Sequence, residues 1–180
     1  MPTANPAFVF YCVIPAEAGN QANLFVLILC YILFMKKEFS ENEIPEIASE
    51  ILRSLEANHY KLQACVLALS GDLGAGKTTL TKEIAKQLGI LETVISPTYV
   101  IMKSYPLEAN NYKLLIHIDA YRLESDDELA RLGWSDLIAD PKNLIIIEWP
   151  EKVKNLIPED ALWIKLSHTE DPKRVIEINS

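Results

Sequence analysis

With 180 residues, of which 49% are hydrophobic and 23% charged, the chain has the size and composition of one soluble globular domain. Its formal net charge of −8 argues against a protein that wraps nucleic acid by itself, because phosphates would repel it unless the basic residues gathered on one face. The cysteines Cys12, Cys30 and Cys65 have neither metal-ligand nor redox spacing, so we expect free thiols in a reducing compartment.

The first 34 residues differ from the rest. They contain one charged residue, Glu17, whereas all 17 lysines and arginines follow Phe34. The apolar run over 24–34 would form a helix of roughly 16 Å, about half of a ~30 Å hydrocarbon core, which is too short to span a membrane. No basic region precedes it and no cleavage site follows, which argues against a signal peptide. Of two interpretations, an anchor or partner-binding segment and an upstream extension, we expect the second, with a domain over 35–180 and no stable membrane association.

A regular pattern begins after Met35 with a helix. Its apolar stripe consists of Ile44, Ile47, Ala48, Ile51, Leu52 and Leu55. Because Pro45 fits only in a first turn, Asn42 is favoured over Ser40 as the N-cap.

A short apolar run over 65–70, CVLALS, predicts a buried strand. The stretch GDLGAGKTTL over 71–80 follows directly, and it has the G-x-x-x-x-G-K-[ST] spacing of a phosphate-binding loop. Residues 78–88 have a helical pattern that Gly89 would end. Because strand, glycine loop and helix are the context that this motif requires, we expect a nucleotide site here.

The loop residues have distinct predicted roles. Lys77 would bridge the β- and γ-phosphates, the Thr78 hydroxyl would bind Mg²⁺, and Thr79 is placed to reach the α-phosphate. The later stretch 96–99, SPTY, is read in two ways: a hydroxyl that senses the γ-phosphate, as in switch loops, or an ordinary turn. The predicted nucleotide-binding residues are therefore Gly71, Asp72, Leu73, Gly74, Ala75, Gly76, Lys77, Thr78, Thr79 and Thr98.

Two further apolar runs, over 114–119 and 143–149, predict buried strands that each reach an acid, Asp119 and Glu148. Both acids would lie at the carboxyl edge of the sheet, beside the nucleotide, and the residues alone do not rank them as the metal-holding acid. We expect His117 to be a satisfied core histidine, while Arg122 fits a phosphate contact and a surface salt bridge equally well.

The remaining pattern completes one domain of the α/β class. We expect a short helix within 125–138, ended by Gly133 and with Leu129 and Leu132 on one face, and late strands over 161–166 and 174–178 near a sheet edge. The tryptophans Trp134, Trp149 and Trp163 are expected to be packing residues. Together these elements predict a mostly parallel sheet flanked by helices. No Asn-Lys-x-Asp element follows, which leaves guanine selectivity unsupported, and there is no obvious arginine-rich lid of the kind that many small-molecule kinases close over the phosphates.

Five blocks occur in order along the chain: GDLGAGKTTL over 71–80, SPTYV over 96–100, HIDAYRL over 117–123, ELARLGW over 128–134 and IIEWPEK over 146–152. This arrangement resembles the TsaE (YjeE) family, the ATPase of bacterial tRNA threonylcarbamoyladenosine synthesis, over about residues 35–179. The resemblance implies a P-loop NTPase fold and a cytoplasmic ATPase that uses ATP and Mg²⁺. It also implies two partners, TsaB and TsaD, of which TsaD carries out the transfer onto tRNA.

The resemblance also implies roles for the site residues. Thr78 and Glu148 would hold the metal, and Asp119 would be the catalytic or water-positioning acid beside Lys77. The acidic net charge suits docking on proteins, with tRNA reached indirectly, and hydrolysis is expected to be slow without partners. Residues 1–34 have no counterpart in the resemblance.

Two alternatives to this ATPase remain open. In a small-molecule kinase for a nucleoside or sugar, Asp119 would be the general base for a substrate hydroxyl. A nucleotide-gated interaction module would bind partners in an ATP-dependent way with negligible turnover.

Overall fold

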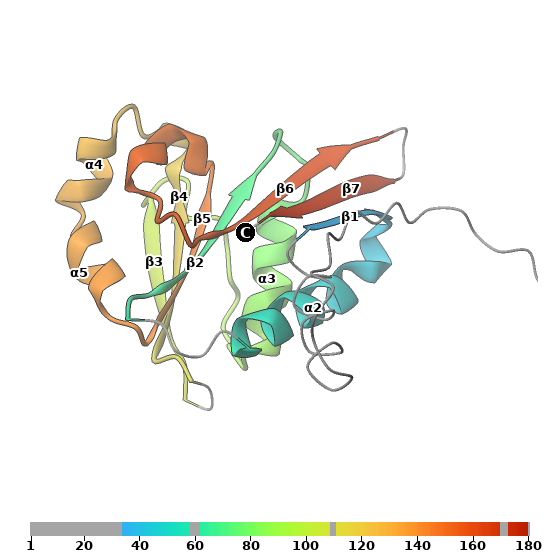
Figure 1. Cartoon of the computed structure of the whole chain (residues 1–180), viewed down its shortest axis with the longest axis horizontal. Coiled ribbons are helices and arrows are strands. Elements are labelled where there is room, and N and C mark those ends of the chain that lie inside the picture. The colour runs from blue at the N-terminus through green and yellow to red at the C-terminus, as the bar shows by residue number, and fades with distance from the viewer. Residues whose placement is uncertain (1–33, 58–61, 109–110, 170–172, 180) are drawn as a thin grey trace, which may run out of the picture.

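A seven-stranded sheet in the order β1-β7-β6-β2-β5-β4-β3 forms the centre of the molecule (Figure 1). The computed structural model describes residues 34–57, 62–108, 111–169 and 173–179. The strands are β1 (Phe34–Phe39), β2 (Cys65–Ser70), β3 (Met102–Pro106), β4 (Leu114–Asp119), β5 (Asn143–Glu148), β6 (Leu162–His168) and β7 (Arg174–Asn179). The four central strands, β6, β2, β5 and β4, pair in parallel, whereas β7, β1 and β3 join through antiparallel pairs. Because β1 is antiparallel to β7 and β7 to β6, β1 runs with the central four, and the sheet is mixed but mostly parallel.

Helices cover both faces of the sheet, as the α/β pattern predicted (Figure 1). Helices α2 (Ile44–Ala57) and α3 (Lys77–Gln87) pack on one face, and α4 (Asp126–Arg131), α5 (Trp134–Ala139) and the 3-10 helix η3 (Pro150–Leu156) pack on the other. The central strand β2 shows why both layers are needed. Its alternate residues Leu67 and Leu69 belong to the apolar cluster under α2 and α3, while Val66 and Ala68 belong to the opposite cluster. All four are buried, so the continuous apolar run of this strand is explained.

The predicted cap of the first helix, Asn42, is wrong. A single 3-10 turn, η1 (Glu41–Glu43), precedes α2, and Ser40 is its N-cap. The Ser40 backbone N–H donates to Glu43 Oε2 at 2.9 Å, and the Ser40 hydroxyl donates to the same oxygen at 2.7 Å. The chain therefore turns into the helix two residues earlier than the position of Pro45 suggests.

The single helix predicted within 125–138 is two short helices. Gly133 adopts φ 85°, a left-handed conformation that ends α4 as expected, and α5 begins at the next residue. This turn redirects the chain, so the prediction that Leu132 shares the buried face of Leu129 is wrong: Leu132 is 38% exposed. Trp134 takes the buried place, and its indole N–H donates to the Leu156 carbonyl at 3.1 Å.

The edge strands are the elements that the sequence did not predict. The strand β1 carries the charged residues Lys36, Lys37 and Glu38, and β3 is only five residues long, so neither has the apolar pattern of the central strands. The predicted late strands are present as β6 and β7, and β7 lies one strand in from the edge. The expected extension over 1–34 lies almost entirely outside the described residues and stays a prediction. Within those residues, none of the helices has the length and apolarity needed to cross a membrane.

Candidate nucleotide and magnesium site

The glycine loop connects the end of β2 to the start of α3 and follows a path that a side chain would block. Gly71 has φ 128°, and a Cβ built on it would lie 2.0 Å from the backbone oxygen of Leu166 in β6. Only glycine fits there without moving the neighbouring strand. The loop therefore packs directly against the sheet, and the N-terminus of α3 opens toward the carboxyl ends of the parallel strands, where a phosphate can meet its N–H groups.

Lys77 lies inside this loop and is 4% exposed. Its ammonium donates to the carbonyl oxygens of Gly71, at 2.6 Å, and Asp72, at 2.9 Å, and lies 3.9 Å from the centroid of the Trp149 ring. Burial lowers the pKa of Lys77, and the negative charge of Glu148 opposes this shift. The direct partners of the ammonium are neutral, so an anionic phosphate group would supply the opposite charge at this position.

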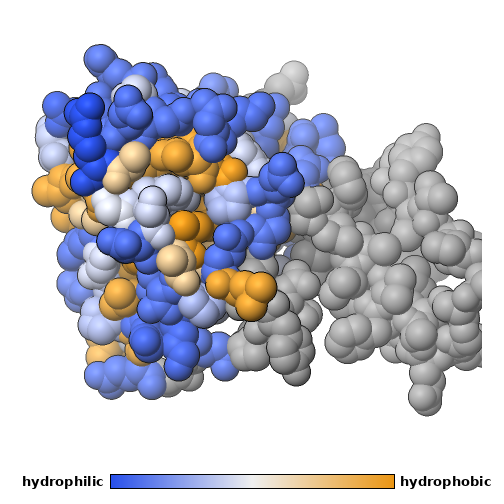
Figure 2. All heavy atoms as spheres, turned by 60° about the vertical axis from the view of Figure 1, so that its left-hand side comes forward, coloured by the Kyte–Doolittle hydropathy of each residue, from blue (hydrophilic) through white to orange (hydrophobic). Residues whose placement is uncertain are grey.

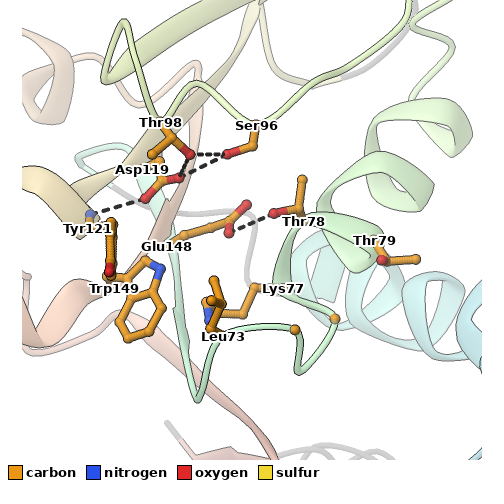
Figure 3. A pocket seen from close by; sticks show the side chains of 12 residues that line it. Leu73, Lys77, Thr78, Thr79, Ser96, Thr98, Asp119, Tyr121, Glu148 and Trp149 are labelled. Carbon is orange, nitrogen blue, oxygen red and sulfur yellow. Dashed lines mark hydrogen bonds between the residues drawn. The ribbon is translucent and has the colours of Figure 1, made fainter.

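Thr78 and Glu148 bring together two oxygen-bearing side chains from segments that lie far apart in the sequence. The Thr78 hydroxyl donates to Glu148 Oε2 at 2.9 Å, across 70 residues of chain (Figure 3). Glu148 ends β5 and is 2% exposed. The described residues contain no cluster of three or more His, Cys, Asp and Glu side chains that could hold a metal ion alone. One hydroxyl and one carboxylate fit Mg²⁺ well, since this ion takes few protein ligands and completes its shell with phosphate oxygens and water.

Asp119 ends β4 in register with Glu148 but has different partners. Its Oδ2 accepts hydrogen bonds from Ser96 Oγ at 2.9 Å and from Thr98 Oγ1 at 2.5 Å, and its Oδ1 accepts from the Tyr121 backbone N–H at 3.0 Å (Figure 3). The carboxylate therefore ties the SPTY loop to the strand end, beside the glycine loop.

These groups surround one cavity of about 380 Å³. Its lining includes Leu73, Gly74, Gly76, Lys77, Thr78, Thr79, Ser96, Thr98, Asp119, Tyr121, Glu148 and Trp149. The structure thus brings together both acids, the loop lysine and seven of the ten residues predicted to bind nucleotide. The other three, Gly71, Asp72 and Ala75, belong to the same loop without lining the cavity. Thr79 lies on the α3 side, apart from the two acids (Figure 3).

A model of the family described as "Threonylcarbamoyl adenosine biosynthesis protein TsaE" matches residues 39–176, which include the whole of this site. The chain belongs to the TsaE family. The resemblance found in the five sequence blocks is therefore confirmed.

Individual members of the TsaE family and a solved structure lead to the same family as the family model does. A protein of Rickettsia conorii named "tRNA threonylcarbamoyladenosine biosynthesis protein TsaE" is 35% identical over 140 residues, covering 77% of this chain and 74% of its own. A protein of the same name from Haemophilus influenzae is 32% identical over 142 residues, covering 79% and 85%. A crystal structure of Bacillus subtilis YdiB superposes with a TM-score of 0.58 at 27% identity, covering 81% of this chain and 85% of that one.

Three residues of this TsaE-family site were not predicted as part of it: Tyr121 and Trp149, which line the cavity, and His117. His117, expected to be a core histidine, is fully buried, but its Nε2 lies 2.8 Å from Glu148 Oε1. Trp149, expected to be a packing residue like Trp134 and Trp163, lines the cavity and contacts Tyr121 with ring centroids 5.1 Å apart. The alternation of His117 with Asp119 put both on one face of β4, but only the strand order reveals that Glu148 lies beside them.

Exposed apolar side chains lie in or next to the segments that line the cavity, and together they are called its rim here. Leu73, Tyr99, Val100 and Tyr121 all project into solvent, and Leu73 and Tyr99 are 79% and 89% exposed. Arg122 is also exposed and lies 5.7 Å from the centroid of the Tyr99 ring. Apolar side chains likewise reach the surface between hydrophilic ones on the face turned forward in Figure 2. Exposed apolar residues around a site are typical of a surface that meets another molecule.

Proposed function

We propose that this chain is an ATP-binding and ATP-hydrolysing subunit needed for threonylcarbamoyl modification of tRNA adenosine next to the anticodon. It would act on a complex of TsaB- and TsaD-type proteins, with TsaD carrying out the transfer. The observation that carries the ATPase part of the proposal is the contact of Thr78 with Glu148, where the glycine loop meets α3. The tRNA part is supported by the names of the relatives, which are tRNA threonylcarbamoyladenosine biosynthesis proteins.

The residues of the loop would bind and orient the triphosphate. Lys77 would exchange its bonds to the Gly71 and Asp72 carbonyls for bonds to the β- and γ-phosphates, which relieves its burial as an unpaired charge. Thr78 and Glu148 would hold Mg²⁺, which would offset the negative charge that builds up on the phosphate oxygens.

Asp119 would orient the attacking water. Each of its carboxylate oxygens accepts bonds from protein donors, and the lone pairs left over can accept a hydrogen from water near the γ-phosphate. Ser96 and Thr98 hold this carboxylate from an exposed loop, so contact of a partner with Tyr99 and Val100 would act on the water-orienting group. This arrangement supports the proposal that the isolated chain hydrolyses ATP slowly and that partners stimulate it.

The surface supports a protein partner more than direct contact with tRNA. The net charge is −8, and the cavity rim carries exposed apolar side chains. We therefore propose that tRNA is reached through the TsaB–TsaD-type complex, and its involvement implies a cytoplasmic location. We also propose that the catalytic domain spans 35–180 and that residues 1–34 are an extension outside it.

The proposal is tested by measuring phosphate release with ATP and Mg²⁺, with and without purified TsaB–TsaD-type complex. The wild type should be slow alone and faster with the complex. Lys77→Ala and Glu148→Ala should each lower the stimulated rate by at least about 10²-fold, because both remove groups that stabilise the transferred phosphoryl group.

Glu159→Ala is the matched control for Glu148→Ala, since Glu159 is an exposed carboxylate in the loop after η3 and should keep the wild-type rate. Full-rate hydrolysis without partners, or wild-type rates in both site variants, would contradict the proposed mechanism. Transfer of the phosphate to an added nucleoside or sugar instead of water would identify a kinase. ATP-dependent binding to the complex that survives loss of hydrolysis would identify an interaction module.

A further inference from the structure

The carboxylate of Glu148 is held at both of its oxygens. Oε2 accepts the hydrogen bond from the Thr78 hydroxyl at 2.9 Å, and Oε1 lies 2.8 Å from Nε2 of His117. His117 belongs to β4, the strand next to β5, and its side chain is fully buried. Two neighbouring elements, α3 and β4, therefore fix the orientation of this one acid.

With Glu148 as a carboxylate, the hydrogen of this contact comes from the histidine. An ionised carboxylate can only accept hydrogen bonds, so the Nε2 atom of His117 carries the hydrogen and donates it to Oε1. The other ring nitrogen, Nδ1, is buried and has no hydrogen-bond partner among the described residues. Glu148 is thus the hydrogen-bond partner that orients this ring within the core.

We propose that His117 is a positioning residue for magnesium binding, an inference that rests on the proposed function. By holding Oε1, it presents Oε2 toward Thr78, the direction from which Mg²⁺ would be bound together with the nucleotide. Without this donor only the Thr78 hydroxyl holds the carboxylate, so its rotation about the last side-chain bond is less restricted. Groups that orient a metal ligand in this way commonly change metal affinity by about 10–100-fold.

The residue type matters as well as its place. Hydrogen bonds to a buried charge are worth more than those between neutral groups, and Glu148 is 2% exposed, with little water to replace a lost donor. Asp119, on the same face of β4, accepts from three other donors, whereas the hydrogen bond of the His117 side chain goes to Glu148, so the effect of His117 should be confined to Glu148.

A pair of amide substitutions separates positioning from packing. In His117→Gln the side-chain amide nitrogen lies near the place of Nε2 and can still donate to Glu148. In His117→Asn the amide is one carbon shorter and lies near the place of Nδ1, so it does not reach. Both variants are neutral and polar, and thermal unfolding checks that both are folded.

The readout is the affinity for a non-hydrolysable ATP analogue, measured by titration calorimetry in EDTA and again in Mg²⁺. All three proteins should bind with similar affinity in EDTA. The gain in affinity on adding Mg²⁺ should fall about 10-fold in His117→Asn and be largely kept in His117→Gln. An Asn variant with the full gain, or a Gln variant that loses as much as Asn, would overturn the proposal. Absence of analogue binding by the wild type in both buffers would instead contradict the proposed function.

A second measurement uses the unsubstituted protein and does not depend on the variants folding. Long-range ¹H–¹⁵N spectra report which ring nitrogen of a histidine carries the hydrogen, and the chain has only three histidines to assign. His117 should show the Nε2–H form, both free and with the Mg²⁺-bound analogue. The Nδ1–H form in either state would overturn the proposal, because that tautomer cannot donate to Glu148.

Discussion

Glu148 and Asp119 end adjacent parallel strands at paired positions, and both are almost completely buried, yet the protein holds them in different ways. The partners of Glu148 are His117 in β4 and Thr78 in α3, so this acid is tied to regular structure. The side-chain partners of Asp119 are Ser96 and Thr98, from a loop between α3 and β3. One side of the cavity is therefore built on the core and the other on a loop.

The loop side is also the exposed side. Tyr99 and Val100, next to Thr98, are 89% and 68% exposed. The next residue, Ile101, adopts a left-handed φ of 65° where the loop joins β3. Such a conformation is costly for a β-branched residue and persists only where its surroundings hold it. This difference in how the two acids are held fits a division between their proposed roles. Glu148 would bind a metal without rearrangement, and Asp119 would respond to a partner that contacts the loop.

Removing the carboxylate of each acid in turn tests this comparison between Asp119 and Glu148 most strongly. Asp119→Asn should lower partner-stimulated phosphate release by about 10²-fold, because the water loses its carboxylate acceptor, while the Mg²⁺-dependent gain in nucleotide affinity stays at the wild-type value. Glu148→Ala should lose both. Rate and affinity are measured on the same preparations, with Asp127→Asn, a change at an exposed helical acid, as the control. Loss of the Mg²⁺-dependent gain in Asp119→Asn would mean that the two acids share the metal and that the division is wrong.

Thr98→Val tests the loop side alone. Valine matches threonine in shape but removes the hydroxyl that lies 2.5 Å from Asp119 Oδ2. We expect phosphate release to fall by about 10-fold, as a hydrogen bond to a charged group is worth about 1.5–3 kcal/mol. Hydrogen exchange of the backbone over 95–101 should become faster, since the loop then keeps only one side-chain bond to the Asp119 carboxylate, from Ser96, beside the backbone bond from the Asp119 N–H to the Ile101 carbonyl.

Thr93→Val makes the same chemical change at an exposed position in the same loop and should alter neither quantity. If Thr98→Val exchanges as slowly as the wild type, the Thr98 hydroxyl does not hold the loop, and the Ser96 bond with the backbone bonds of the turn is sufficient.

Much of the site could be predicted because its residues are close in sequence or follow one strong rule. The glycine loop needs only the strand before it and the helix after it, and the acids Asp119 and Glu148 could be placed at strand ends by their apolar runs. The contact of Glu148 with Thr78 spans 70 residues and depends on β5 lying beside β2, which a local pattern does not encode. For the same reason His117 resembled an ordinary core residue.

The misplaced elements share a physical cause. A local pattern predicts buried faces well, but it does not predict how the chain enters or leaves an element. The cap at Ser40 depends on a 3-10 turn before α2, and the exposure of Leu132 depends on the change of direction at Gly133. The edge strand β1 is held by its backbone pairing with β7. This pairing does not need apolar side chains, so it forms with charged residues such as Lys36 and Lys37 in the strand.

Ser40 offers the weakest and most informative comparison with Asp119, because it makes the same hydroxyl-to-carboxylate contact, to Glu43, near the surface. Ser40→Ala should lower the free energy of unfolding by about 1 kcal/mol at pH 7, the usual cost of losing a cap, and leave phosphate release unchanged. Hydrogen bonds from Ser40 lower the pKa of Glu43 from the ordinary value of 4.5; the bond from its hydroxyl contributes most and the bond from its backbone N–H contributes second.

A carboxyl group whose pKa is lower in the folded protein stabilises the fold above the unfolded pKa, and this contribution disappears as the pH falls through the lowered value. The difference between Ser40→Ala and wild type in urea unfolding should therefore be largest near pH 7 and shrink below about pH 4.5. A difference that stays constant into acid would show that the serine stabilises η1 without help from the charge of Glu43. In that case the charge of the carboxylate would not explain why the Thr98–Asp119 contact matters more than the Ser40–Glu43 contact. The burial of Asp119 alone would have to explain why Thr98→Val slows phosphate release and Ser40→Ala does not.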